Sequence, residues 1–381
     1  MSLSLLLLPR RGLLLAAAAV GRRSLSQARP RRSGDRTRPH AKSRLTGTAG
    51  AATLVGSLSL SVFSMFSRKA EKEKQGEEGQ NEETEEDTII FLLKKAKLSI
   101  MKGELEEAER LLHEAAGLSH QSDNKKAIIY TYDTMANLAF LRGQLDHAEK
   151  LFKAAMSYLL AGDMKQDDNA IIEMSLKLAS IYAAQEQHKL ALAGYEFCIL
   201  TLEEKIAKQK DMPADGLPEE EKVDTLLLLG MTLDSYARFL LAHDQAAVAQ
   251  RMYKRALQIS LDVQGETHPQ TVVVMNDLAT ALDAQGLYGD AYAQAKRASE
   301  LAQQTEHPEA HIVLNNLAGI LMHKEDYSQA RKVYKEALAR AEKAEDITSA
   351  QYIRKELAEL TRRKKEKEQP KSTADFAGEQ K

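Results

Sequence analysis

Small residues recur at a fixed spacing along most of the chain, and this recurrence restricts the fold more than any other feature. In each of six units, a small residue is followed by alanine twelve positions later and by another small residue seven positions after that. Seventeen of these eighteen positions hold alanine, and Cys198 occupies the other. Small side chains let two helices cross closely, so the spacing predicts helix–turn–helix hairpins. The first positions are Ala96, Ala136, Ala179, Ala237, Ala279 and Ala318; the second are Ala108, Ala148, Ala191, Ala249, Ala291 and Ala330; the third are Ala115, Ala155, Cys198, Ala256, Ala298 and Ala337.

Six hairpins of this kind are expected to stack into one all-α array, because a single hairpin cannot bury its apolar face alone. The units begin near residues 89, 129, 172, 230, 272 and 311, so the array spans 89–345. The long unit before residue 230 contains a Pro- and Glu-rich insertion at 207–222, which we expect to be a loop. Residues 346–368 are predicted to form a capping helix, and residues 369–381 a disordered tail.

The hairpin pattern resembles the tetratricopeptide repeat (TPR) family. Gly103, Gly143 and Gly286 each lie seven positions after the first small residue, where the chain must turn between two helices. The units are longer than the usual 34 residues, and this long form is similar to the repeats of kinesin light chains. The segments 265–269 and 314–318 carry that likeness. The resemblance implies a helix-hairpin solenoid that binds peptides on its concave face.

The N-terminal region differs in composition from the array. Residues 1–44 carry a net charge of +10, with ten Arg and one Lys against one acid, which is typical of a mitochondrial transit peptide. Residues 45–66 contain no charge and are long enough to span a bilayer, and either a removed presequence or an inner-membrane anchor fits them. Residues 67–88 hold nine acids and four bases, so we expect an acidic disordered linker.

Composition argues against most kinds of chemistry. The residues after 44 carry a net charge of −12, which disfavours nucleic-acid binding. The lone Cys198 is expected to be a buried packing residue, and His307 with His311 lacks a third metal ligand. No phosphate loop or nucleophile–base pair is visible. We therefore predict no cofactor, no metal and no enzymatic activity, with a hydrolase of unrecognised site as the alternative from a different class.

Polar residues on the first helix of several hairpins form the candidate peptide-binding groove. Asparagine side chains both donate and accept hydrogen bonds, which suits recognition of a peptide backbone. A chaperone-type carboxylate clamp would need a basic residue where Asp133 stands, although the positions of Asn137 and Lys177 match it. The groove candidates are Asn137, Lys177, Arg238, Asn276, Thr280, Asp283, Asn315, Asn316 and His323.

Longer segments resemble the mitochondrial tetratricopeptide repeat protein 19 family. The likeness rests on segments that include 123–132, 138–145, 170–185, 194–198 and 280–286. It implies an inner-membrane location and a role in maintaining respiratory complex III, through binding of its subunits and handling of its Rieske iron–sulfur protein. The alternative is a general mitochondrial adaptor or import co-chaperone.

Overall fold

The computed structural model describes residues 85–162, 165–211 and 218–368, and within these ranges it contains thirteen α-helices and no strand. The expected all-α hairpin fold is confirmed. The helices form two compact units, one ending at Gln264 and the other beginning at Gly265. The first unit contains α4 (Glu85–Lys102), α5 (Leu105–Gln121), α6 (Lys125–Leu141), α7 (Leu145–Ala161), α8 (Asn169–Ala184), α9 (His188–Lys210), α10 (Glu219–Ala242) and α11 (Ala246–Gln264). The second contains α12 (Pro269–Ala284), α13 (Tyr288–Gln304), α14 (Ala310–His323), α15 (Tyr327–Lys343) and α16 (Ile347–Glu368).

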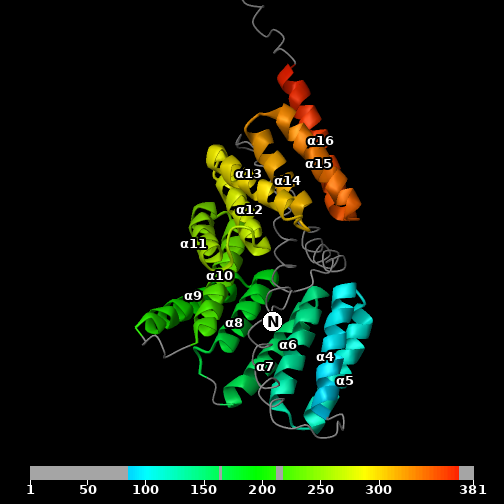
Figure 1. Ribbon diagram of the computed structural model, residues 1–381, viewed down its shortest axis with the longest axis vertical. Coiled ribbons are helices and arrows are strands. Elements are labelled where there is room, and N and C mark those ends of the chain that lie inside the picture. Colours follow the sequence, from blue (N-terminus) through cyan, green and yellow to red (C-terminus); the bar gives the residue numbers. More distant parts are fainter. Residues whose placement is uncertain (1–84, 163–164, 212–217, 369–381) are drawn as a thin grey trace, which may run out of the picture. The chain divides into compact units, whose positions relative to one another are not determined.

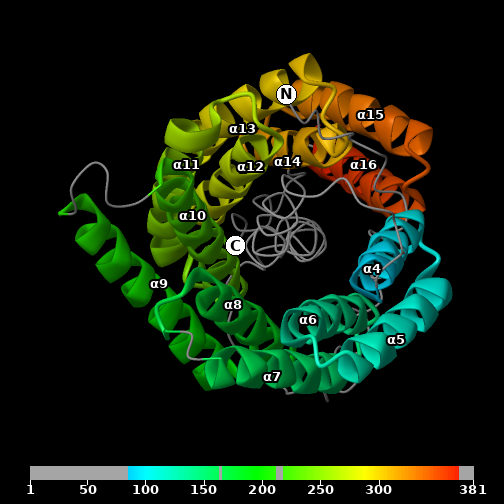
Figure 2. The same cartoon turned by 60° about the horizontal axis from the view of Figure 1, so that its bottom comes forward.

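Each unit consists of two layers of helices. In the first unit, α4, α6, α8 and α10 form an inner layer and α5, α7, α9 and α11 an outer layer (Figures 1 and 2). In the second unit, α12, α14 and α16 are inner and α13 and α15 are outer. The most extensive packing in each unit joins the two helices of one hairpin, such as α6 with α7 and α14 with α15.

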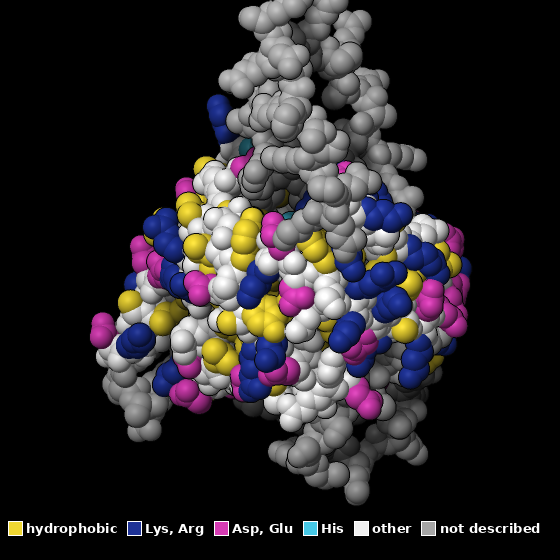
Figure 3. All heavy atoms as spheres, turned by 90° about the horizontal axis from the view of Figure 1, so that it is seen from above, with side chains coloured by type: hydrophobic (Ala, Val, Ile, Leu, Met, Phe, Trp, Pro, Cys, Tyr) yellow, Lys and Arg dark blue, Asp and Glu magenta, His cyan; other side chains and the backbone are white. Residues whose placement is uncertain are grey.

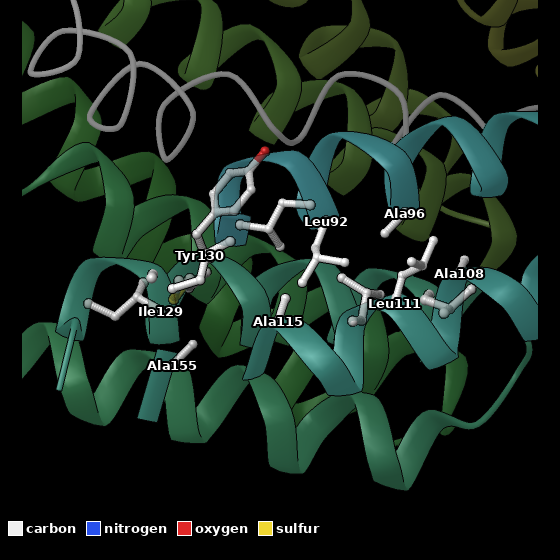
Figure 4. Close-up of a cluster of buried hydrophobic side chains, with 14 of the residues drawn as sticks. Leu92, Ala96, Ala108, Leu111, Ala115, Ile129, Tyr130 and Ala155 are labelled. Atoms are coloured by element: carbon white, nitrogen blue, oxygen red, sulfur yellow. The ribbon is translucent and has the colours of Figure 1, made fainter. Parts of the chain in front are cut away.

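The predicted small residues lie where the helices of each hairpin cross. All eighteen are at most 1% exposed. Larger side chains fill the spaces beside them: Phe152, Tyr253 and Tyr334 are each 1% exposed. Figure 4 shows this packing in the first unit, where Leu92 and Ala96 of α4 meet Leu111 and Ala115 of α5. The apolar core is therefore continuous from one hairpin to the next within the unit.

The turn inside each hairpin has one residue in the left-handed region. As predicted, Gly103, Gly143 and Gly286 have φ values of 81°, 73° and 78°. The other three hairpins hold a non-glycine residue at the same position, although a side chain is strained there. These residues are Glu186, Asp244 and Glu325, with φ values of 61°, 61° and 63°.

Several predicted segments lie at or beyond the edges of the described ranges. Helix α4 begins at Glu85, inside the predicted acidic linker, and α9 and α10 extend into both ends of the predicted 207–222 insertion. Helix α16 covers the region expected to cap the array. The predicted transit peptide 1–44, the apolar segment 45–66 and the tail 369–381 lie outside the described residues.

Helix α16 is fixed to α14 through one carboxylate. Asp346 accepts hydrogen bonds from the Ser349 backbone N–H at 3.0 Å and from the Ser349 hydroxyl at 2.7 Å. The Nε2 atom of His311 lies 3.2 Å from the same carboxylate. Burial raises the pKa of Asp346, but the bonds from His311 and Ser349 outweigh it and bring the pKa to about 2.

Replacing Gly194 with alanine tests the close approach of α8 and α9. A Cβ at Gly194 would lie 2.8 Å from the Cβ of Ala179, so we expect Gly194→Ala to destabilise the protein by about 1–3 kcal/mol. The matched control is Gly117→Ala in α5, where no atom lies within 4 Å of the new Cβ. That change should stabilise by about 0.5–1 kcal/mol, since alanine favours helix. Urea denaturation measures both, and equal effects would contradict the packing.

The Asp346 carboxylate should make the second unit sensitive to acid. Because its folded-state pKa lies below its usual value, its contribution to stability is present above about pH 4 and is lost as the pH falls through about 2. Asp346→Asn should remove this dependence and lower stability at pH 7. Thermal melts of both proteins between pH 7 and pH 2 measure it, and identical pH profiles would disprove the assignment.

Candidate functional site

The nine predicted groove residues all lie on inner-layer helices. They come from α6, α8 and α10 in the first unit and from α12 and α14 in the second. Most of these nine side chains contact one another or nearby charged residues, and the contacts divide them into separate sets. The sets are a charge cluster on α4, α6 and α8, an ion pair on α10, and an amide chain with a histidine–carboxylate pair on α12 and α14.

Asp133 is the centre of the charge cluster. Its Oδ1 accepts a hydrogen bond of 2.6 Å from the Lys177 ammonium, and its Oδ2 accepts one of 3.0 Å from the Asn137 amide. Glu173 lies one turn before Lys177 and forms a second ion pair with it at 3.1 Å. Burial lowers the pKa of Lys177, but the charges of Asp133 and Glu173 outweigh this effect and raise it. Lys177 therefore remains protonated at neutral pH.

Lys97 of α4 interacts with the charges of this cluster. Its ammonium lies 4.8 Å from the centre of the Tyr130 ring. Burial, helped by the charge of Lys177, lowers the pKa of Lys97 and outweighs the charges of Asp133 and Glu173, which act to raise it. Two ammonium groups and two carboxylates thus balance one another, and Lys177, Asp133 and Glu173 are at most 3% exposed, so the cluster is not a basic site for an anionic ligand.

Arg238 of α10 does not join that cluster. It forms an ion pair with Asp234, one turn earlier on the same helix. Burial raises the pKa of Asp234, and the Arg238 charge opposes this shift. The Oδ1 atom of Asp234 has no hydrogen-bond donor among the described residues.

In the second unit, the predicted asparagines are connected by hydrogen bonds. The Asn316 amide donates to the Oδ1 of Asn276 at 3.2 Å, which links α14 to α12. The Asn315 amide donates to Asn316 at 3.4 Å, while the Oδ1 of Asn315 has no donor within the parts of the chain that the structure describes. The Thr280 hydroxyl donates to the Asn276 carbonyl at 3.2 Å.

Asp283 and His323 form a second link between α12 and α14. The Nδ1 of His323 lies 2.8 Å from one carboxylate oxygen of Asp283 and 2.9 Å from the other. The Tyr288 ring lies beside this histidine, with 5.6 Å between ring centres. Five of the six predicted residues on these two helices therefore take part in, or lie beside, contacts between the helices, and the sixth, Thr280, binds its own helix.

Sequence reasoning missed the acids that partner these groups. Glu173 and Asp234 were not among the candidates, Asp133 was considered only as a mismatch to a clamp, and the nearby cation Lys97 was missed as well. The available signal was spacing: an acid stands four residues before Asn137, Lys177 and Arg238, and side chains four apart on a helix face one another.

The other chemical candidates are occupied by structural contacts. His307 accepts a hydrogen bond of 3.1 Å from the Glu309 backbone, and His311 contacts Asp346. Burial raises the pKa of Cys198 to about 12, which keeps this thiol protonated and weakly nucleophilic at neutral pH. The described residues contain no group of three or more His, Cys, Asp or Glu positioned to hold a metal ion.

Comparison with known proteins assigns the family. Models described as tetratricopeptide repeat match residues 228–304 and 313–345. The Homo sapiens protein named Tetratricopeptide repeat protein 19, mitochondrial, is 56% identical over 278 residues, which cover 73% of this chain and 73% of that protein. The Rattus norvegicus protein of the same name is 55% identical over 304 residues, covering 80% and 83%. The chain belongs to the mitochondrial tetratricopeptide repeat protein 19 family.

Solved structures support the fold of this family member. The apo form of RapI superposes with a TM-score of 0.53 and 14% identity, and the match covers 80% of this chain and 79% of RapI. At this identity the likeness concerns the helical repeat fold alone. The relatives carry the word mitochondrial in their names, so the predicted mitochondrial protein is confirmed at that level.

The distribution of surface charge and the hydropathy of the helices bear on binding to nucleic acid and to a membrane. On the face shown in Figure 3, Lys and Arg side chains are interspersed with Asp and Glu. Among the described helices, α10 is long and apolar enough to cross a membrane, but more than half of its apolar stretch is buried within the protein. We therefore interpret α10 as a core helix of the first unit.

Replacing Lys177 with methionine tests the charge cluster. Methionine keeps the length of the side chain but leaves Asp133 and Glu173 without their shared cation, so we expect a loss of about 3 kcal/mol in the free energy of unfolding. The control is Lys153→Met on α7, which removes a more exposed ion pair with Glu149 and should cost under about 0.5 kcal/mol. Chemical denaturation measures both, and equal losses would refute a special role for Lys177.

Proposed function

We propose that this chain is a non-enzymatic protein of the mitochondrial inner membrane that binds respiratory complex III and assists its assembly and maintenance. In this proposal it holds a peptide segment of a complex III subunit, the Rieske iron–sulfur protein, and aids the turnover of that subunit. Family membership supports the proposal, since the segment-level resemblance to the tetratricopeptide repeat protein 19 family carries these associations. The groove is the surface that would do the binding.

The single observation that carries the binding role is the amide chain of α12 and α14. Asn276, Asn315 and Asn316 offer donors and acceptors on neighbouring inner helices, and the Oδ1 of Asn315 has no donor among the described residues. A peptide N–H could supply that missing donor, and a buried acceptor gains most from being satisfied. The hydrogen bonds inside the chain are 3.2–3.4 Å long, so a ligand can replace them at modest cost.

The charge cluster argues against the co-chaperone alternative. A carboxylate clamp requires free cationic side chains that face a peptide C-terminus. Here Asp133 and Glu173 both neutralise Lys177, and no basic residue replaces Asp133. The inner face of α6 and α8 therefore favours a neutral polypeptide segment over a terminal carboxylate.

The inner-membrane location rests on the sequence outside the described residues. The uncharged segment 45–66 is long enough to span the bilayer and precedes the array by a short acidic stretch. Protease protection of mitoplasts, combined with N-terminal sequencing of the mature chain, tests both the anchor and the side that the array faces. Release of the intact mature chain by carbonate extraction would contradict an anchor.

Asn315→Ala combined with Asn316→Ala tests the binding surface. We expect the double variant to capture about tenfold less complex III, because each lost hydrogen bond to the partner contributes about 0.5–1.5 kcal/mol. The measurement is the amount of Rieske protein and other complex III subunits that co-purify from detergent-solubilised mitochondria lacking the wild-type chain. Circular dichroism checks that helicity is kept.

The control for this experiment lies on the outer layer of the same unit. Lys332→Ala with Lys335→Ala changes two exposed residues of α15 and should leave capture unaltered. Capture of chaperones or translocase subunits in place of complex III would favour the adaptor alternative. Undiminished capture by the asparagine variant would show that the partner binds elsewhere.

A further inference from the structure

The outward face of α9 carries a stripe of exposed apolar side chains, which we call the α9 stripe: Leu190, Ala193, Phe197 and Leu200. Leu190, Phe197 and Leu200 are 49%, 40% and 61% exposed. Their spacing of three, four and three residues places them on one side of the helix. The opposite side of α9 is already packed in the core, through residues such as Tyr195 and Leu202. The stripe is therefore apolar surface that the fold itself does not use.

The other outer helices provide an internal comparison. The α9 stripe occupies the positions one before and two, six and nine after the second alanine of its hairpin. In each of the other five outer helices, at least three of these four positions are polar or charged. In α5, for example, they include Glu107, Arg110 and Glu114. The repeat architecture thus accepts polar residues there, and α9 alone among the described outer helices has an apolar face.

Helix α9 also extends further than its neighbours. It has 23 residues, whereas α5 and α7 have 17 each and α11 has 19. Its C-terminal part projects from the outer layer of the first unit (Figure 2). The stripe at 190–200 lies mainly in the N-terminal half of this helix, before the projecting part.

We propose that the α9 stripe is a self-association surface, on which α9 of a second copy of this chain packs antiparallel. A two-fold axis level with residue 195 would place Leu190 beside Leu200 of the other copy, and the small Ala193 beside the large Phe197. The same arrangement brings Lys189 at the start of the stripe near Glu204 at its end. Both residues are exposed, and they have opposite charges. The stripe is thus complementary to itself in shape, and its two Lys189–Glu204 pairs oppose the repulsion between the two Glu196 carboxylates that the same axis brings together.

The size of the stripe sets the strength of this dimer. Four side chains on one helix supply on the order of a few hundred Å² of apolar surface per copy, below the total of about 1,200–2,000 Å² found in stable interfaces. The dimer is therefore weak and depends on concentration. The carboxylates of Glu196 and Glu204 beside the stripe disfavour an anionic membrane as the occupant.

Sedimentation velocity of the full chain in detergent, over a wide range of concentrations, tests the dimer. Wild type should shift from monomer to dimer, and Leu200→Glu should raise the dissociation constant at least about tenfold, since two leucines leave each interface. The matched control is Ala339→Glu on α15, which adds the same charge at the equivalent exposed position of another hairpin. It should leave the dissociation constant unchanged, and both variants should keep the wild-type thermal melt.

Charge reversal tests the antiparallel register. Lys189→Glu and Glu204→Lys should each weaken the dimer by roughly fivefold, because each creates like charges at two symmetric sites. The combined variant should return to within about twofold of wild type. A chain that stays monomeric, or a dimer insensitive to Leu200→Glu, overturns the proposal, as does binding of wild type to anionic vesicles through Leu200 without dimerisation. A double variant weaker than either single one overturns the antiparallel pairing.

Discussion

The close crossing of the two helices in each hairpin is the constraint on which the rest of the structure depends. At Gly194 and Ala179 there is no room for one more methyl group, and every third-position residue is fully buried. Because interhelical distance follows the size of the side chains at the contact, these residues fix how deeply the outer helix sits against the inner one. That depth in turn decides which side of each inner helix and which side of each outer helix is left uncovered by the hairpin. The crossing thus sets which positions face outward on every outer helix, but not which residue types occupy them.

The fold was predictable because its signal is repeated. One small residue predicts little, but eighteen at identical spacing define the crossing, the turn and the number of hairpins. The turns at Glu186, Asp244 and Glu325 were not predictable from residue type, since these side chains favour other conformations. Their position was still given by the repeat: packing on both sides imposes the left-handed residue, whichever amino acid stands there. The division of the chain between Gln264 and Gly265 could not be predicted, because the spacing of the small residues does not change there.

The candidate site was predictable only in part, because spacing along one helix does not reveal contacts between helices. The groove positions were inferred from single inner helices, whereas Lys177 binds Asp133 from the preceding hairpin and Asn316 binds Asn276 from the preceding hairpin. These contacts change the chemistry of the surface. A lysine taken alone predicts an anion site, but the charge of Lys177 is balanced by two carboxylates, and the ion pair with Asp133 joins two inner helices. The same groups therefore hold neighbouring inner helices together, and a ligand of the proposed groove would exchange hydrogen bonds with most of them, the Oδ1 of Asn315 being the exception.

This shared use explains why the two faces of the array differ in what they can bind. On the inner face, most of the predicted groove residues already have a partner, so the proposed binding there would depend on replacing weak bonds such as those of Asn315 and Asn316. On the outer face, the repeat imposes no such pairing, and the residue types are free to vary from hairpin to hairpin. The fold therefore does not explain why all four outward positions of α9 hold apolar residues. In a repeat protein, the position that departs from its equivalents is the one where a selective pressure other than folding acts, and on α9 that departure is a surface suited to another helix.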